Sequence, residues 1–258
     1  LDVPSLRQVD AMVGRNEDSC TYPVFMRGSR GELIFRYRDG YSGNGVDFYN
    51  TYDPETQKWR RLIEQPLLDG LDRMNAYARM PELGPDGRYH LVWMWRDDYR
   101  CETNHTPSYA RSDDLVNWET SRGEPLQLPI TIENGEVIDP VPVGGGVINM
   151  SLSLGFDADN RPVVSYHKYD SDGKSQAYSA RLEGSSWKVY QTSDWIYRWN
   201  FDGGGAVPAE IRIGAVKPNA SGGLEQSYHH ILEGSGLWTL DPDTLKPVGE
   251  IRPVPPAL

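Results

Sequence analysis

The sequence predicts an all-β fold, a β-propeller made of repeated blades. No stretch of about a dozen residues shows the apolar period of 3.6 residues that an amphipathic helix requires. Residues typical of strands and of turns are both frequent, with 15 Tyr, 8 Trp, 26 Gly and 19 Pro among 258 residues. Together with an internal repeat, this composition predicts short strands joined by many turns.

The repeat begins with a strand that follows a Gly or Asn, residue types that favour a turn. Four segments fit this description, at residues 31–38, 87–95, 160–167 and 222–229. The number of residues between the starts of successive copies is larger than a plain four-stranded blade needs, and long loops on one face would account for the additional residues. We therefore expect residues 1–258 to form a single propeller domain of about four to five blades, with a β-sandwich as the alternative.

Each copy continues with a second strand and a polar turn. In the first three copies this turn leads to Trp59, Trp118 and Trp187, while the fourth ends on Leu245 and Lys246. A Trp at this place can fill the space beneath the strand. The three tryptophans are therefore expected at equivalent positions in successive four-stranded blades.

Charge and hydropathy exclude several classes of partner. The formal net charge of −11 argues against nucleic acid and anionic membrane surfaces, because a protein that binds a phosphate backbone needs a basic face. The longest apolar runs are far shorter than a membrane span, so the chain is expected to be soluble.

The two cysteines, Cys20 and Cys101, could form a disulfide, stay free or bind a metal, and their number leaves all three open.

Several separated motifs point to one family. They lie at residues 20–25, 32–40, 73–77, 103–105, 109–118 and 164–170. Together they resemble the BNR-repeat propellers of polysaccharide-degrading bacteria, which include the ulvan lyases, related rhamnose–glucuronate lyases and α-L-rhamnosidases. The resemblance covers nearly the whole chain.

The resemblance implies a secreted or periplasmic polysaccharide lyase that cleaves a uronate-containing, ulvan-like chain by β-elimination. By resemblance, Tyr22 matches the catalytic tyrosine, Arg38 matches the arginine that neutralises the uronate carboxylate, and Tyr77 is a substrate contact. Arg's planar fork suits a carboxylate, and a tyrosine hydroxyl suits proton transfer. The spacing of Tyr22 and Arg38 fits one hairpin with its turn near residues 28–31, which would place the two side chains in the same cleft. Arg36 and Trp195 are further predicted substrate contacts. An alternating aromatic strand at Trp195 can present a platform for sugar rings, and core packing of these aromatic residues is the alternative.

One departure from the family concerns the N-terminal blades. Family members carry a histidine pair there, and one of the two histidines serves in catalysis. The chain has no counterpart of this pair, so it is expected to be part of a seven-bladed ring that is incomplete at the N-terminus. A second chain or segment would then complete the propeller.

A second group of residues has the side chains that zinc prefers. His90, Cys101 and His105 form a His-x10-Cys-x3-His pattern, and His167 in the equivalent strand of the next repeat is the candidate fourth ligand. This set predicts a structural zinc ion that joins blades. The alternative is that His90 and His167 are core histidines bonded to backbone and that Cys101 is a small buried apolar residue.

Two other functions compete with the lyase. One is a glycoside hydrolase on the same scaffold, either an α-L-rhamnosidase or a sialidase-like enzyme. However, the arginine triad of sialidases cannot be assembled from this sequence. The other is a propeller that binds carbohydrate without catalysis, because a fold alone does not decide function.

Overall fold

The structure is a computed structural model and describes residues 10–253. Within this range nearly all regular structure is β-strand, and the one helical element is the 3-10 turn η1 (Cys101–Thr103). The all-β prediction is therefore confirmed. No helix among the described residues is long and apolar enough to cross a membrane.

Two of the four sheets are four-stranded antiparallel meanders, in which each strand pairs with the next along the chain. The first sheet consists of β1 (Cys20–Arg27), β2 (Leu33–Tyr41), β3 (Asn44–Asp53) and β4 (Lys58–Arg61). The third sheet consists of β11 (Ser153–Phe156), β12 (Pro162–Tyr169), β13 (Ser175–Glu183) and β14 (Ser186–Gln191). Such a meander is the unit from which propeller blades are built.

The other two sheets contain the same meander with short additional strands. The second sheet consists of β5 (Asn75–Ala78), β7 (Tyr89–Arg96), β8 (Asn104–Ser112) and β10 (Glu136–Val137), with β6 (Glu82–Leu83) on β7 and β9 (Trp118–Glu119) on β8. The fourth sheet consists of β15 (Ile211–Ile213), β17 (Leu224–His230), β18 (Gly234–Leu240) and β19 (Pro247–Pro253), with β16 (Lys217–Pro218) on β17.

The three repeat tryptophans lie in corresponding strands. Trp59 is in β4, Trp118 in β9 and Trp187 in β14, and each of these strands pairs with the strand before it. The three tryptophans therefore lie in equivalent strands of successive sheets, as the repeat predicts. Their burial differs, because Trp118 is 3% exposed in the core whereas Trp59 and Trp187 pack at the margins of other clusters.

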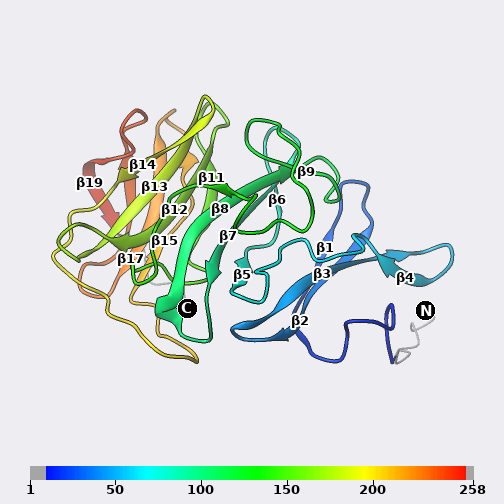
Figure 1. The fold of residues 1–258 in the computed structure, drawn as a ribbon. Coiled ribbons are helices and arrows are strands. Elements are labelled where there is room, and N and C mark those ends of the chain that lie inside the picture. The colour runs from blue at the N-terminus through cyan, green and yellow to red at the C-terminus, as the bar shows by residue number, and fades with distance from the viewer. Residues whose placement is uncertain (1–9, 254–258) are drawn as a thin grey trace, which may run out of the picture.

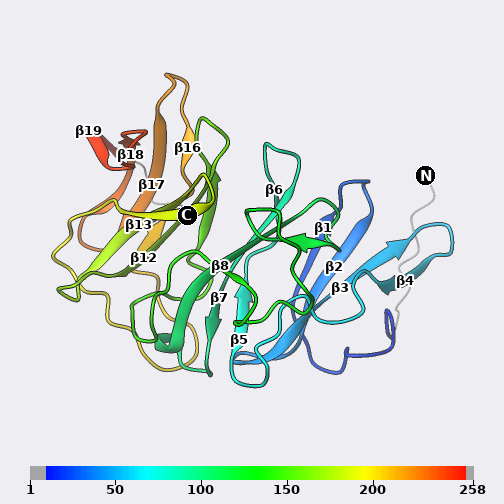
Figure 2. The same cartoon turned by 45° about the horizontal axis from the view of Figure 1, so that its top comes forward.

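The four sheets follow one another across the molecule, from the blue β1–β4 sheet to the orange and red β15–β19 sheet (Figures 1 and 2). Strand β7 shows how they pack. Leu91, Trp93 and Trp95 belong to the core shared with the first sheet, whereas Val92 and Met94 belong to the core shared with the third. Because successive residues of a strand point to opposite faces, the middle of β7, which is buried on both sides, is apolar on both faces.

A third core lies between the third and fourth sheets and includes Val163, Ala177, Leu224 and Trp238. Residues 10–253 thus form four curled sheets packed face to face, as in a propeller, and the two-sheet sandwich is wrong. A closed seven-bladed ring is not seen in this part of the chain. The remainder of the predicted 1–258 domain lies outside the described residues.

The packing predicts that the interior Trp of β7 is essential for stability. Trp93 is fully buried between the first two sheets. We expect Trp93→Ala to lower the free energy of unfolding by about 3–5 kcal/mol, because it removes a large apolar side chain and leaves a cavity. Urea denaturation measures the change. The control Ile196→Ala removes an 87% exposed side chain and should change stability by less than about 0.5 kcal/mol. Equal losses would contradict this account of the core.

Candidate active site

A cavity of about 250 Å³ lies where the first and second sheets meet. Its lining residues are Tyr22, Pro23, Val24, Arg36, Arg38, Tyr77, Ala78, Asn149 and Met150. The structure therefore brings together four of the five side chains that the sequence predicts to act on or contact the substrate. The fifth, Trp195, lies elsewhere.

The β1–β2 hairpin places Tyr22 beside Arg38. Its turn is closed by a hydrogen bond of 2.9 Å from the Gly31 N–H to the Gly28 carbonyl, as the sequence predicts, and Thr21 is opposite Arg38 in the ladder. The pairing is irregular between Thr21 and Val24, and Tyr22 has a φ of +51°, which is uncommon for a residue other than glycine. Such a bulge redirects a side chain, and the Tyr22 side chain is 48% exposed.

Arg38 donates hydrogen bonds to acceptors in its own sheet and in the second sheet. Its Nε donates to Asp47 Oδ1 at 3.3 Å, and Nη2 donates to the Ala76 carbonyl of β5. The residue is only 2% exposed, and Nη1 is buried with no hydrogen-bond partner among the described residues. An unpaired buried donor is costly. Nη1 is therefore the group of Arg38 that a ligand oxygen in the cavity would satisfy.

The cavity wall has an excess of positive charge. Arg36 and Arg38 share one carboxylate, because Arg36 Nη2 also donates to Asp47. Burial would lower the pKa of Arg36, but Asp47 and Tyr49 raise it above its ordinary value, so Arg36 stays charged. Two arginines facing a single carboxylate leave one net charge for an anionic ligand.

Arg96 adds a second uncompensated charge beside the cavity. It ends β7, is 4% exposed, and donates to the carbonyls of Tyr99 and Arg100 and to the side-chain oxygen of Asn149. No carboxylate lies within 4 Å of it in the described chain. Arg96 therefore strengthens the preference of this site for an anion.

Tyr77 is the aromatic centre of the site. The Cζ atom of Arg38 lies 4.5 Å from its ring centroid and that of Arg96 lies 5.3 Å away, while Arg38 is 5.4 Å from the Tyr22 ring. The Tyr77 hydroxyl accepts a hydrogen bond of 2.7 Å from the Gly43 N–H. Burial would raise the pKa of Tyr77, but the Ser42 hydroxyl, Arg38, the Gly43 N–H and Arg96 together lower it below the ordinary tyrosine value.

Sequence reasoning missed Asp47, Arg96 and Asn149. Asp47 could have been found by counting across the β2–β3 hairpin, where it is opposite Arg38. Arg96 directly follows the repeat strand of the second copy, close to the place that Arg38 has in the first. Asn149 comes from the loop before β11, and no pattern in the sequence indicates that this loop returns to the cavity.

Trp195 does not line this cavity, and the segment that carries it is not the strand that the sequence predicts. It follows β14, and its ring packs 4.5 Å from His230 and 5.9 Å from Trp238 of the fourth sheet. The aromatic surface of the fourth sheet therefore determines its position.

The predicted zinc ligands have separate environments. His90 Nδ1 is 2.6 Å from the Tyr109 hydroxyl and its Nε2 is 3.0 Å from Asp86 Oδ1. His105 Nε2 is 3.0 Å from Asp97 Oδ1, and its Nδ1 is 2.9 Å from the Thr106 hydroxyl. Both rings therefore use their two nitrogens in hydrogen bonds to protein side chains.

The other two candidates are core residues. Cys101 is buried at the start of η1 in the core of the last two sheets. His167 packs against Trp199 and Phe201, and burial lowers its pKa to about 4. Among residues 10–253 no three His, Cys, Asp or Glu side chains come together to hold a metal ion. The predicted convergence of His90, Cys101, His105 and His167 is therefore wrong in this structure.

The two cysteines are both free in the structure. Cys20 is exposed in β1, and Cys101 is buried in the core of the third and fourth sheets. Of the three states that the sequence leaves open, the free thiol is the one observed.

A comparison with models of known protein families identifies the family of this chain. The model that describes BNR repeat-containing family members matches residues 1–195 of the chain. The chain belongs to the BNR repeat-containing family. This confirms the resemblance that the separated motifs indicate.

Two curated members of known activity are similar to this BNR-repeat protein. The short isoform of ulvan lyase from Alteromonas sp. (strain LOR) is 30% identical over 142 residues, which are 48% of this chain and 26% of that protein. The long isoform from Pseudoalteromonas sp. (strain PLSV) is 26% identical over 121 residues, which are 43% of this chain and 12% of that protein. This BNR-repeat protein therefore spans about a quarter or less of the curated relatives that it matches.

Solved structures support the fold of the BNR-repeat protein. An ulvan lyase of polysaccharide lyase family PL25, also solved bound to -[GlcA(1-4)Rha3S]-, has a TM-score of 0.65 and 14% identity, over 90% of this chain and 55% of that chain. The polysaccharide lyase Uly1 has a TM-score of 0.55 and 14% identity, over 92% of this chain and 59% of that chain. At this identity the likeness concerns the fold alone.

The pKa of Tyr77 can be measured directly. With tyrosine labelled with carbon-13 at Cζ, we expect the Tyr77 resonance to titrate below the ordinary tyrosine pKa. Tyr49, whose pKa burial raises to about 12, should titrate later. Tyr77→Phe and Tyr49→Phe assign the two signals. Arg96→Met should move the Tyr77 titration to higher pH, because it removes one positive neighbour. A Tyr77 that ionises together with or after Tyr49 would refute the electrostatic description of the site.

Proposed function

We propose that this protein is a polysaccharide lyase that cleaves a uronate-containing, ulvan-like chain by β-elimination. The observation that carries the proposal is the cavity in which the half-paired guanidinium of Arg38 lies beside the accessible Tyr22. The similarity to ulvan lyases supports the same reaction class. Because the chain spans only part of these relatives, activity and substrate are both proposals for this protein.

The reaction requires three events at one uronate unit. The proton on C5 is removed by a base, the C4–O4 bond breaks, and O4 receives a proton as the C4–C5 double bond forms. Negative charge builds up next to the C5 carboxylate in the transition state, so a cation that pairs with this carboxylate accelerates the reaction. The products are an unsaturated uronate at one new end and a free hydroxyl at the other.

We assign binding of the uronate carboxylate to Arg38, through its unpartnered Nη1. Arg36, which shares Asp47 with Arg38, contributes further positive charge. The Tyr22 hydroxyl is assigned to proton transfer, because this side chain is 48% exposed and is therefore able to reach the substrate. In the simplest form, its phenolate takes the proton from C5 and returns it to O4. Tyr77 lines the same cavity and contacts the substrate, and Arg96 beside the Tyr77 ring adds positive charge. A polymeric substrate agrees with the proposed secreted or periplasmic location.

Incubation with ulvan tests the function, since an unsaturated uronate absorbs ultraviolet light and the intact sugar does not. We expect absorbance to rise with time. New reducing ends without absorbance would indicate a glycoside hydrolase. No reaction at all would leave carbohydrate binding as the function of this chain and would overturn the lyase proposal for it.

Tyr22→Phe tests the proton transfer. It keeps the ring and removes the hydroxyl, so we expect the lyase rate to fall by about 10²-fold or more. Tyr41→Phe is the matched control, because Tyr41 lies in the same hairpin, is 63% exposed and bonds to Ser19. The control should keep the rate of the unmodified protein. Full activity of the Tyr22 variant would remove Tyr22 from the mechanism.

Arg38 is tested by two substitutions. Arg38→Met should reduce kcat by about 10²–10³-fold, because the developing charge loses its nearest donor while Arg36 and Asp47 remain as a balanced pair. Arg38→Lys keeps the charge but loses the planar fork, so we expect a smaller loss. Circular dichroism checks that both variants fold. If both variants react as fast as the unmodified protein, Arg38 does not bind the carboxylate.

A further inference from the structure

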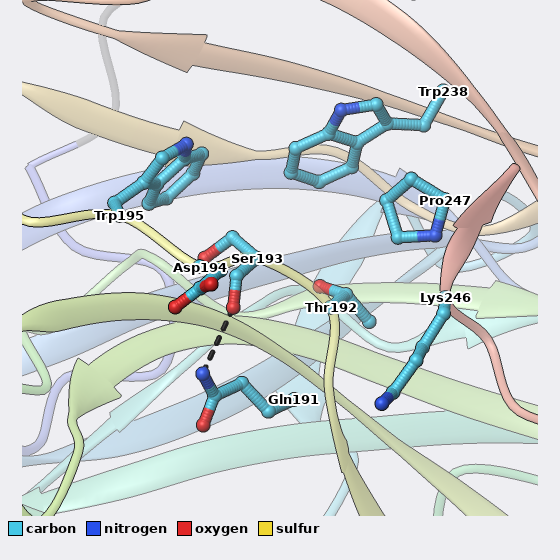
Figure 3. Close-up of a pocket in the computed structure, with 8 residues that line it drawn as sticks. All are labelled: Gln191, Thr192, Ser193, Asp194, Trp195, Trp238, Lys246 and Pro247. Carbon is cyan, nitrogen blue, oxygen red and sulfur yellow. Dashed lines mark hydrogen bonds between the residues drawn. The ribbon is translucent and has the colours of Figure 1, made fainter. Parts of the chain in front are cut away.

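A second and larger pocket lies away from the cavity just described. It has a volume of about 620 Å³ and opens between the end of the third sheet and the outer strands of the fourth. The residues that line it are Gln191, Thr192, Ser193, Asp194, Trp195, Trp238, Lys246 and Pro247, as drawn in Figure 3. None of them lines the cavity of Tyr22 and Arg38. The volume is in the usual range for small-molecule sites.

Two indole rings form the apolar part of this pocket. Trp238 stacks on Tyr228 with ring centroids 4.2 Å apart and planes 17° apart, and Trp195 packs 4.5 Å from His230. The two indoles are 5.9 Å apart, and Pro247 lies beside Trp238 (Figure 3). Trp238 is only 4% exposed, so Trp195, which is half-buried and fixed by these contacts, is the indole that offers accessible apolar surface.

The segment that carries Trp195 is held by one buried side chain. Gln176, 1% exposed, accepts hydrogen bonds from the Trp195 N–H at 2.8 Å and the Ser193 hydroxyl at 2.7 Å. Its amide also donates to the Trp195 carbonyl at 2.7 Å. Both the backbone and the ring of Trp195 are therefore fixed before any ligand binds.

Three polar groups of the pocket are free to bind a ligand. The Thr192 side chain is 3% exposed, and its hydroxyl is buried with no hydrogen-bond partner among the described residues. Within residues 10–253, neither Asp194 nor Lys246 has an oppositely charged group within 4 Å. Lys246 extends along the pocket toward Thr192 and Gln191 (Figure 3). An unsatisfied buried hydroxyl is unusual in a protein interior and points to a ligand that supplies its partner.

We propose that this pocket binds a sugar unit of a polysaccharide, as a second saccharide site that takes no part in catalysis. A pyranose ring has an apolar face that can pack on Trp195 and hydroxyl groups that both donate and accept hydrogen bonds. Asp194 accepts, Lys246 donates, and Thr192 does both. A phosphate or another compact anion fits less well, because the carboxylate of Asp194 offsets the single cation.

The inference rests on this pocket and does not depend on the assignment of the catalytic residues. A second saccharide site would increase the overall affinity of the protein for a polymeric ligand. A long chain that is bound at one place is present at high effective concentration for a second place on the same molecule. Loss of this pocket should therefore weaken binding of polymer without changing the turnover of short fragments.

Electrophoresis in native gels containing ulvan tests the proposal, with Tyr22→Phe as the background so that the polymer is not cleaved. Thr192→Val removes a hydroxyl that has no protein partner, and Lys246→Ala removes an exposed ammonium, so both variants should fold. We expect each to weaken retention by about 10-fold, the loss typical of one hydrogen bond to a charged or buried group. Lys217→Ala, an exposed lysine in β16 outside the pocket, is the matched control and should leave retention unchanged.

The outcomes separate this inference from the proposed lyase. Unchanged retention of both pocket variants overturns the second site, even if the unmodified protein cleaves ulvan. Reduced retention of both supports it, even if ulvan is not cleaved. Absence of retention in the Tyr22→Phe background itself, or equal losses in the Lys217→Ala control, also overturns it. Melting temperatures of all variants verify that the effects are not due to unfolding.

Discussion

The structure depends on one constraint, which is that the second and third sheets each pack against a neighbouring sheet on both faces. A strand such as β7 is buried on both sides, so all eight of its residues are buried and it has no free face for polar chemistry. Functional side chains are placed in two ways. Arg96 at the end of β7 and Tyr22 at the irregularity of β1 lie where regular pairing stops. Arg36 and Arg38 lie within β2, and the carboxylate of Asp47 on β3 compensates part of their buried charge.

The same constraint explains the charge arrangement around Arg38. Two guanidinium groups and one carboxylate, all below 10% exposure, are expensive to remove from water, and a buried ion pair contributes little net stability. Asp47 holds Arg36 and Arg38 in fixed positions while it neutralises only one of them. The group is therefore better understood as a preorganised anion site than as a stabilising salt bridge.

The sequence predicted the parts of the site that depend on local register. The spacing of Tyr22 and Arg38 defines a hairpin, and the turn at residues 28–31 determines which residues are opposite each other, so their proximity follows from the pattern alone. The repeat likewise predicted the strand positions of Trp59, Trp118 and Trp187. Contacts between sheets were harder to predict. His90 and His105 bond to carboxylates in nearby loops, and Trp195 packs against the aromatic surface of the fourth sheet. The sequence did not predict these contacts, because loop conformation and sheet packing leave no periodic signal in it.

Strand β19 forms the edge of the fourth sheet, and its seven residues are all exposed. Exposed edges are templates for pairing with another molecule, and proteins protect them with prolines and charges. Here Pro247 and Pro253 lie at the two ends of the strand, and Glu250 and Arg252 lie between them. The prolines lack N–H donors, and the charges would lose their hydration in a dry interface. This edge is therefore built to resist self-association, even though it closes one side of an aromatic pocket.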